Sequence, residues 1–348
     1  MNATDEPVPE LSVVIPAYDA VGTLPTQLEA LLAQRPAWPW EVLVADNGST
    51  DATAALVRSW AADRMPELRL VDASARRGPS AARNIGVAAA RAPRIAFCDA
   101  DDRVGDGWVA AMRRALDEHE FVAGPFEGRR LNEGLRSAVS WTAQAHGLTV
   151  KPFLPQFVTA GSGNMGVRTA VFEEVGGFDE GARTAEDDDF CLRVQLHGHE
   201  LAFDPTIVLH VRRRDGLWDV CRQAYSYGGG ERRLEHRYAE FVAEARSTQT
   251  PAAADGGDAG APADGSGAGP EPSRVRRVPG AVVAVVRRVG RVAGRAVRKA
   301  ASVRHPGDLS DVAWRVCWSL GWHLTRVDPA TPQVSRTHPD SLQGDLRR

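Results

Sequence analysis

The sequence predicts an α/β protein with a mostly parallel central sheet and helices on both of its faces. Two observations lead to this fold class. In the first 120 residues, short β-branched runs alternate with stretches of helical spacing, which is the pattern of parallel strands joined by crossover helices. Polar residues able to do chemistry follow the strand-like runs, and ligands of such sheets bind beyond the carboxyl ends of the strands.

The expected strands and helices alternate along the chain. We expect strands at 11–18, 41–46, 67–73 and 93–100. Helices should lie between and after them, at 22–34, 51–63, 80–91 and 108–118. The pattern weakens from 121 to 160, which we interpret as a looser insertion. The remaining expected elements are helices at 168–175, 187–197 and 215–227 and a strand at 201–211.

The composition is that of an ordinary globular protein. Of 348 residues, 43% are hydrophobic and 25% charged, which excludes an intrinsically disordered chain or a collagen-like fibre. The four cysteines show no Cys-x-x-Cys spacing, so neither a disulfide scaffold nor a structural zinc site is expected. The longest apolar stretch of the C-terminal region, 281–286, is far shorter than the roughly 20 residues of a membrane span. We therefore expect a cytoplasmic protein without a transmembrane helix.

Charge divides the chain into an acidic body and a basic segment. Residues 274–304 hold ten Lys/Arg and no Asp/Glu, whereas the first 273 residues hold 40 acidic and 27 basic side chains. Between these regions, 247–273 is rich in Gly, Ala, Asp and Pro and is expected to be a flexible linker. We therefore predict a catalytic domain at 1–246, a linker at 247–273 and a basic amphipathic helical tail at 274–348.

An acidic turn follows the fourth expected strand. Asp99, Asp101 and Asp102 place three carboxylates within four residues, and these repel one another unless a cation or a polar loop compensates them. Asp99 and Asp101 can share one divalent ion and leave coordination sites for phosphate oxygens. The alternative is a solvated acidic turn, but the position directly after a buried strand favours a site.

Three further features belong to the same predicted edge of the sheet. Asp46 ends the second strand, where its carboxylate can accept hydrogen bonds from a base or a ribose, or cap a helix. The Pro-Ala-Tyr turn at 16–18 offers a ring face. Arg76, Arg77 and Arg83 surround a helix start, which suits a diphosphate. Each feature alone also fits a plain loop or a basic surface helix.

Six segments, taken together and in this order, resemble the family 2 glycosyltransferases of the GT-A fold. They are VVIPAYDA, ADNGSTD, RGPSAARNIG, FCDADD, GSGNMGVRTAVFEEVGGFDE and EDDDFCLRV. The resemblance covers residues 11–215. It implies transfer of a sugar from a nucleotide-diphosphate donor to an acceptor, with inversion, aided by Mg²⁺ or Mn²⁺.

The resemblance also implies roles for single residues on the donor side. The implied nucleotide-binding set is Pro16, Ala17, Tyr18, Asp46, Arg77, Arg83 and Asp99. Asn47 stands where a second Asp is often found. Asp101 is implied as the direct metal ligand, and His210 as a second ligand that completes the metal shell.

A second acidic run, EDDD at 186–189, opens the expected helix 187–197. In the family pattern its second residue is the general base, which implies Asp187, because an acceptor hydroxyl needs a carboxylate beside it to take its proton. Successive helical residues point about 100° apart, so only one of Asp187 and Asp188 can face the acceptor. The alternative is an acidic helix start favoured by the dipole. The residues expected around the cleft are Asn84, Asn164, Met165, Glu186, Asp188 and Arg212.

The C-terminal tail indicates contact with a membrane surface. Valines and alanines from 275 to 303 recur every three or four residues, with arginines on the opposite face, as in an interfacial helix on anionic lipid. Trp314, Trp318 and Trp322 place three indoles on one helix face, which suits the membrane boundary or a protein core. We expect peripheral attachment to the inner face of a membrane through 274–304, with docking on the catalytic domain or a partner as the alternative.

The predicted function is sugar transfer from a nucleotide-diphosphate donor to a sugar or lipid-linked acceptor in cell-surface or lipid-linked glycan synthesis. A dehydrogenase would need the motif G-x-G-x-x-G after the first strand. A nucleotidyltransferase usually has a Gly-rich loop that ends in Arg at the same place. The chain has PAYDAVGTL there, which argues against both classes of enzyme. A catalytically inactive sugar-nucleotide-binding or scaffold protein is the alternative. No motif for binding nucleic acid is present, so no such partner is expected.

Overall fold

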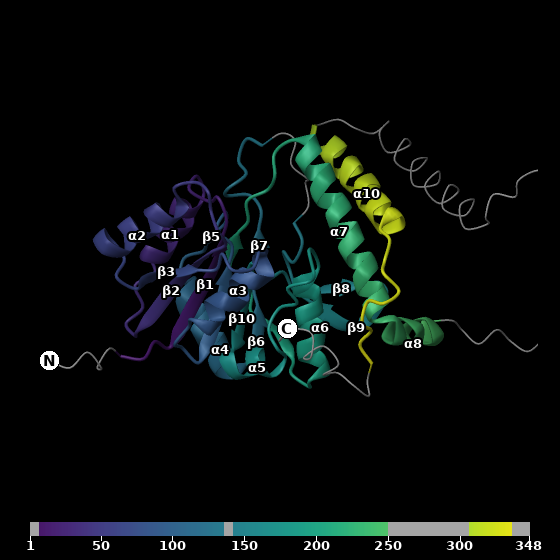
Figure 1. Ribbon diagram of the computed structural model, residues 1–348, viewed down its shortest axis with the longest axis horizontal. Helices are drawn as coiled ribbons and strands as arrows, with labels where there is room; N and C mark the ends of the chain where they lie inside the picture. Colours follow the sequence, from purple (N-terminus) through teal and green to yellow (C-terminus); the bar gives the residue numbers. More distant parts are fainter. Residues whose placement is uncertain (1–6, 136–141, 250–305, 336–348) are drawn as a thin grey trace, which may run out of the picture.

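The computed structural model describes residues 7–135, 142–249 and 306–335 (Figure 1). Its centre is a seven-stranded sheet with the strand order β11-β6-β10-β4-β1-β2-β3. The four strands expected from the first 120 residues are present as β1 (Leu11–Ala17), β2 (Trp40–Asp46), β3 (Leu68–Asp72) and β4 (Arg94–Cys98). They are parallel to one another. The predicted α/β fold class is confirmed.

Helices cover both faces of this sheet because successive residues of each buried strand point to opposite sides. Val13 and Ile15 of β1 pack with α1 (Leu24–Leu32), α2 (Thr53–Asp63) and α4 (Trp108–Glu118). Val14 of the same strand belongs to the opposite core. That core is closed by α3 (Pro79–Ala88), α5 (Thr169–Glu174) and α6 (Glu186–Leu196).

The region expected to be a looser insertion, 121–160, contains strands. β6 (Phe121–Ala123) extends the sheet, and β10 (Asn164–Arg168), just after this region, is antiparallel to both β4 and β6. β8 (Thr149–Lys151) and β9 (Leu154–Thr159) form a separate hairpin. These strands have six residues or fewer, too few for the alternation of apolar residues to be recognised in the sequence.

The single strand expected at 201–211 is wrong. The segment divides into β11 (Leu201–Phe203), which joins β6, and β12 (Leu209–His210), which joins β5 (Arg103–Val104) and β7 (Phe126–Glu127) in a three-stranded sheet. A turn separates the two strands, because the Asp204 carboxylate accepts hydrogen bonds from the backbone N–H of Thr206 at 2.8 Å and from its hydroxyl at 2.6 Å.

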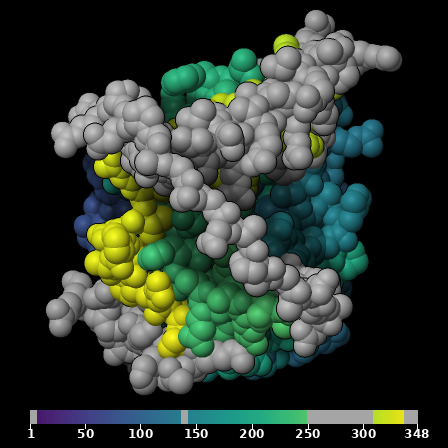
Figure 2. All heavy atoms as spheres, turned by 90° about the vertical axis from the view of Figure 1, so that its right-hand side faces the viewer, coloured from purple at the N-terminus to yellow at the C-terminus, as the bar shows by residue number. Residues whose placement is uncertain are grey.

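The remaining helices lie at one end of the sheet. α7 (Leu217–Arg237) is longer than expected, and α8 (Ala239–Gln249) follows it. α10 (Pro306–Leu324) lies along α7. Figure 2 shows α10 in yellow beside the green chain of α7 and α8 on one face of the molecule.

α8 ends just inside the segment predicted as a linker, and the rest of 247–273 lies outside the described residues, as does the basic helix expected at 274–304. Within the described ranges, no helix combines the length and hydropathy that crossing a membrane requires. The tryptophan stripe is described. Two of its indoles pack against residues before the predicted linker, Trp314 on Tyr227 and Trp322 on Phe153, as the docking alternative expects.

Candidate active site

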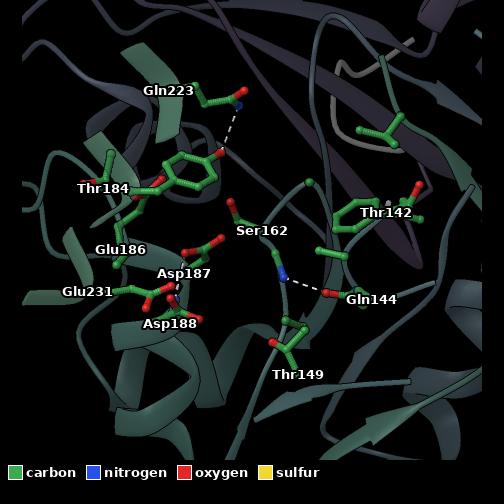
Figure 3. Close-up of a pocket in the computed structure, with 18 of the residues that line it drawn as sticks. Thr142, Gln144, Thr149, Ser162, Thr184, Glu186, Asp187, Asp188, Gln223 and Glu231 are labelled. Carbon is green, nitrogen blue, oxygen red and sulfur yellow. Dashed lines mark hydrogen bonds between the residues drawn. The ribbon is translucent and has the colours of Figure 1, made fainter. Parts of the chain in front are cut away.

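A cavity of about 660 Å³ lies at the carboxyl end of β4. It is walled by the turn after β4, the β8–β9 hairpin, the loop 160–163, the start of α6, the loop 211–214 and the helix pair α7–α10. Figure 3 shows polar side chains from several of these segments converging on its interior, among them Asp187, Ser162 and Glu231. The cavity therefore joins segments that are far apart in the sequence, from Arg83 to Trp318.

The acidic run at the start of α6 places four neighbouring carboxylates in four different surroundings. Three of them are paired with cations: Glu186 with Arg83 (3.5 Å), Asp188 with Lys151 (2.8 Å) and Asp189 with Arg193 (2.8 Å). The buried Asp189 carboxylate also contacts Arg237 and accepts a hydrogen bond from the hydroxyl of Tyr238, so its oxygens are occupied by protein partners. Asp187 has no ion pair within the described part of the chain and accepts the backbone N–H of Asp188 at 2.9 Å.

The carboxylate of Asp187 points into the open centre of the cavity (Figure 3). Burial, together with the negative charges of Asp188 and Glu186, raises the pKa of Asp187 to about 8, while Lys151 acts in the opposite direction. A carboxyl group that titrates near neutral pH is suited to accept a proton from a reacting hydroxyl. Among the four acidic residues, Asp187 is the one that is placed for acid–base chemistry.

Lys151 bridges two of the carboxylates in the wall. Its Nζ lies 2.8 Å from Asp188 and 3.2 Å from Glu231 of α7. Burial disfavours the ammonium, but Asp188 and Glu231 outweigh this effect and raise the pKa of Lys151. The bridge therefore ties α6 to α7 beside Asp187 with a permanent positive charge.

The residue before the acidic run has an unusual backbone conformation. Ala185 has φ +63°, in the left-handed region that non-glycine residues rarely adopt. Its carbonyl accepts the N–H of Asp189 at 3.0 Å, so the sharp turn leads directly into the helix. The Thr184 hydroxyl fixes the turn on α7 through the carbonyl of Ser226 at 3.0 Å.

The acidic turn after β4 also borders the cavity, through Asp99 and Asp102. Asp99 binds the buried Arg83 at 2.7 Å, and Asp102 accepts the backbone N–H of Arg212 at 2.8 Å. Burial and the charges of Asp101 and Asp99 raise the pKa of Asp102 well above its ordinary value. Asp101 is exposed and has no ion pair within the described residues. A positive charge near Asp101 would relieve the repulsion in this turn.

These residues fit a divalent cation held partly by a substrate. Within the described ranges, no three His, Cys, Asp or Glu side chains converge to form a complete metal site. Magnesium is commonly held by one or two protein carboxylates and by substrate phosphates. Asp101, an exposed residue two positions from Asp99, suits such a partial ligand set.

His210 lies in β12, opposite Arg103 of β5. Its Nδ1 is 2.7 Å from Glu127, an arrangement that also orients metal-binding histidines. However, Nε2 lies 3.5 Å from the guanidinium of Arg130. Binding of a metal at this nitrogen would require Arg130 to move.

The predicted nucleotide-binding turn lies at the ends of β1 and β2, where Ala17 and Asp46 are paired in register. Asp46 accepts hydrogen bonds from the backbone N–H and the hydroxyl of Ser49 at 3.0 and 2.5 Å. Tyr18 is half exposed, and Pro16 is partly buried. The Asp46 carboxylate thus stabilises the turn that contains Ser49, and the half-exposed side chain of Tyr18 is accessible to a ligand.

Two family models match the chain. Glycosyl transferase family 2 matches residues 12–176, and glycosyl transferase family group 2 matches residues 95–327. This chain belongs to the family 2 glycosyltransferases. It is therefore a sugar transferase, and its relatives include proteins of polysaccharide and lipid-linked glycan synthesis.

Two curated relatives illustrate this similarity. The succinoglycan biosynthesis protein ExoO of Rhizobium meliloti is 29% identical over 272 residues, which cover 69% of this chain and 76% of that protein. The dodecaprenyl-phosphate galacturonate synthase of Rhizobium johnstonii is 30% identical over 149 residues, which cover 41% of this chain and 44% of that protein. This glycosyltransferase thus spans most of the first relative and under half of the second.

A solved structure supports the fold over almost the entire glycosyltransferase. The mannosyltransferase PcManGT of Pyrobaculum calidifontis, in complex with GDP-Man and Mn²⁺, superposes with a TM-score of 0.55 at 19% identity. The match covers 90% of this chain and 87% of that chain.

The structure brings six of the predicted residues of the glycosyltransferase into the cavity wall. They are Arg83, Asp99, Glu186, Asp187, Asp188 and Arg212. Arg83 is central to this group, because it is buried between Asp99 and Glu186 and so links the acidic turn to α6. Arg77 is exposed in the loop before α3 and does not line the cavity.

Three residues expected around the cleft are corrected by the structure. The side-chain amide of Asn84 donates hydrogen bonds to the carbonyl of Phe178 and to the Glu180 carboxylate, and it accepts one from the backbone N–H of Phe178. Asn164 is fully buried, accepts a hydrogen bond from Trp108 and donates to the carbonyls of Pro125 and Ile207. Met165 is a core residue of the sheet. None of the three lines the cavity, because each is directed into the protein.

Several residues of the glycosyltransferase cavity could not be found from the sequence. Lys151 and Glu231 lie in segments without a recognisable motif, and they meet only because β8 and α7 are adjacent in the fold. Trp314 and Trp318 were identified as a stripe, but the periodicity did not indicate the surface that they face. The spacing of these tryptophans was the only sequence signal that pointed to these cavity residues.

Proposed function

We propose that this glycosyltransferase moves a sugar, with inversion, from a nucleotide-diphosphate donor to an acceptor hydroxyl, with Asp187 as the general base. One observation carries the proposal. Asp187 is the member of the acidic run that has no cationic partner within the described residues, it points into the cavity, and its pKa is raised to about 8.

The reaction is a single displacement at the anomeric carbon. The acceptor oxygen forms a bond to that carbon as Asp187 takes the hydroxyl proton, and the bond from the carbon to the diphosphate oxygen breaks on the opposite face. The electron pair of that bond leaves with the nucleoside diphosphate. One displacement without a covalent sugar–enzyme intermediate inverts the configuration.

The donor binds on the side of the acidic turn after β4. Pro16, Ala17, Tyr18 and Asp46 contact the nucleotide, and Arg83 holds the Asp99 carboxylate in position. Arg77 and Arg212 lie on loops beside this side and supply positive charge toward the diphosphate. Asp101 and His210 would hold Mg²⁺ or Mn²⁺ together with the diphosphate, and His210 would need Arg130 to move aside. The cation would stabilise the negative charge of the leaving group.

The acceptor is a glycan or a lipid-linked sugar at the inner face of a membrane. Two relatives support this class through their names, one in succinoglycan biosynthesis and one a dodecaprenyl-phosphate sugar synthase. The basic segment 274–304, with ten cationic and no acidic side chains, is the part that we assign to anionic lipid.

A donor screen tests the proposal. The full chain is incubated with UDP-, GDP- and dTDP-sugars, with and without Mn²⁺, and binding and donor hydrolysis are measured for wild type, Asp101→Ala and Asp187→Asn. We expect metal-dependent binding of one donor, lost in Asp101→Ala but kept in Asp187→Asn while turnover disappears. Asp106→Asn, an exposed aspartate outside the cavity wall, is the matched control. If no donor binds, the transferase proposal fails and the inactive scaffold takes its place.

A further inference from the structure

The helix α10 is docked on α7 at very short range. A Cβ atom on Gly228 of α7 would lie 1.9 Å from the carbonyl oxygen of Trp318, and one on Gly321 of α10 would lie 2.0 Å from that of Tyr225. Any larger residue at either position would force the helices apart. Gly228, unfavourable in the middle of a helix, is explained by this close approach, whereas its neighbours Gly229 and Gly230 face Thr325 and Thr184.

This docking brings two tryptophans to the cavity. Trp314 and Trp318 of α10 line it, next to Tyr227 of α7. The ring of Trp314 packs edge-on against Tyr227 at 5.7 Å, and Trp318 stacks on Trp322 at 5.4 Å. We call Trp314, Trp318 and Tyr227 the aromatic wall.

The aromatic wall is bordered by hydrogen-bonding groups. Gln223 donates to the Tyr227 hydroxyl at 3.3 Å. Glu231 is approached by the indole of Trp318, whose hydrogen bond opposes the rise in the pKa of Glu231 that burial causes. Thr184 and Asp187 line the same cavity, and Figure 3 shows Gln223, Thr184 and Glu231 together with Asp187 around its interior.

We propose that the aromatic wall binds a saccharide ring of the acceptor and presents its hydroxyl to Asp187. A sugar ring has an apolar face of C–H groups and an edge of hydroxyls, so it fits flat aromatic surfaces surrounded by polar side chains. Gln223, Glu231 and Thr184 each have at least one protein partner but can make further hydrogen bonds. Sugar hydroxyls would use this capacity, whereas a hydrocarbon chain would desolvate it at a cost in free energy. The inference rests on the proposed function, since it takes Asp187 as the base.

The assignment gives the C-terminal region a part in recognition. α10 lies at 306–324, far along the chain from the strands of the donor side, yet it supplies two of the three aromatic rings. The acceptor subsite is therefore incomplete unless α10 is docked on α7.

The test measures saccharide binding apart from donor chemistry. The full chain, wild type and Trp314→Ala, is applied to an array of immobilised mono- to tetrasaccharides and to vesicles containing a polyprenyl phosphate. We expect binding to a subset of the saccharides that weakens about tenfold or more in Trp314→Ala and is partly restored in Trp314→Phe. Trp218→Ala, which removes a tryptophan of α7 that is 73% exposed and does not line the cavity, should bind as wild type does.

Donor binding and hydrolysis of each variant separate the two proposals. Unchanged donor binding and an unchanged melting temperature in Trp314→Ala would place its defect in the acceptor subsite. The inference is overturned if wild type binds a donor but no saccharide, if Trp314→Ala binds saccharides as wild type does, or if Trp314 is needed only for vesicles. Failure of all donors to bind would instead remove the proposed function.

Discussion

The proposed donor side and the proposed acceptor side of the site are assembled in different ways. The proposed donor side consists of the turns after β1, β2 and β4, which are neighbours in one parallel sheet; of these three turns, only the one after β4 lines the cavity. The acceptor side joins the β8–β9 hairpin, the start of α6, α7 and α10, which are distant in the chain. Strand order alone brings the proposed donor residues together, whereas the proposed acceptor residues depend on ion pairs and close helix packing.

The strongest test of this comparison is the substitution Asp187→Asn. It keeps the shape of the side chain but removes the proton acceptor, so we expect transfer to fall by about 10²–10⁴-fold. Donor affinity should stay within the error of the wild-type value, because the residue lies on the acceptor side. A parallel loss of donor affinity, measured by calorimetry, would show that the two sides are not separate.

The pH dependence of transfer should report the same residue. Asp187 must be deprotonated to act, and its pKa is raised to about 8. The rate of transfer at low substrate concentration should therefore rise with pH, about tenfold per unit below that pKa, and become constant above it. A profile that is flat between pH 6 and pH 9 would contradict the assignment of Asp187 as the base.

Lys151 sharpens the comparison, because it is the link between α6 and α7. In Lys151→Met the positive charge that lowers the pKa of Asp187 is lost, so the pH profile should move to higher pH. Asp188 and Glu231 are left as unpaired charges, which costs about 3–5 kcal/mol when one partner of a buried pair is removed. Lys151→Arg keeps the charge and should restore much of the wild-type profile. A change in stability without a shift of the profile would make Lys151 purely structural.

Asn164 tests the corrected part of the site. In Asn164→Ala, the indole N–H of Trp108 and the carbonyls of Pro125 and Ile207 lose a partner, so the free energy of unfolding should fall by about 1–3 kcal/mol for each group left unsatisfied. The affinity for the donor of the folded fraction should not change. A selective loss of affinity, with an unchanged denaturation midpoint, would return Asn164 to the cleft.

The effect of Asp187→Asn on stability should have the opposite sign to its effect on transfer. Asp187 has a higher pKa in the folded state than its ordinary 3.8, so the folded protein binds a proton that the unfolded chain releases. Its contribution to stability is therefore complete below about pH 4 and is lost as pH rises toward 8. Asp187→Asn should be more stable than wild type, by a margin that grows over this range, as measured by urea denaturation at several pH values.

The sequence predicted the strands of the parallel sheet well because their signals are local. Each strand is a continuous apolar run, so a residue at or directly after its end, such as Asp46 or Asp99, lies at the carboxyl edge of the sheet. Asn164 and Met165 were misplaced because their segment forms β10, a short strand whose side chains point into the core. A motif identified the segment but not the direction of its side chains.

The acceptor side could be predicted only in part. The acidic run at 186–189 indicated a base, but the pairing of Asp188 with Lys151, which leaves Asp187 facing the cavity, depends on a contact between residues 37 positions apart in sequence. The position of α10 likewise depends on Gly228 and Gly321, which read as weaknesses of their helices in the sequence. Such contacts between distant residues leave no periodic pattern.

The left-handed backbone of Ala185 has a consequence for how the protein can evolve. A β-carbon in this conformation costs about 1–2 kcal/mol relative to glycine, so the wild-type residue gives up stability at the turn that precedes Asp187. Glycine would remove that strain and would also let the turn sample other conformations. Alanine restricts the turn to fewer backbone conformations. The single substitution Ala185→Gly would therefore give a more stable protein in which Asp187 is held less precisely.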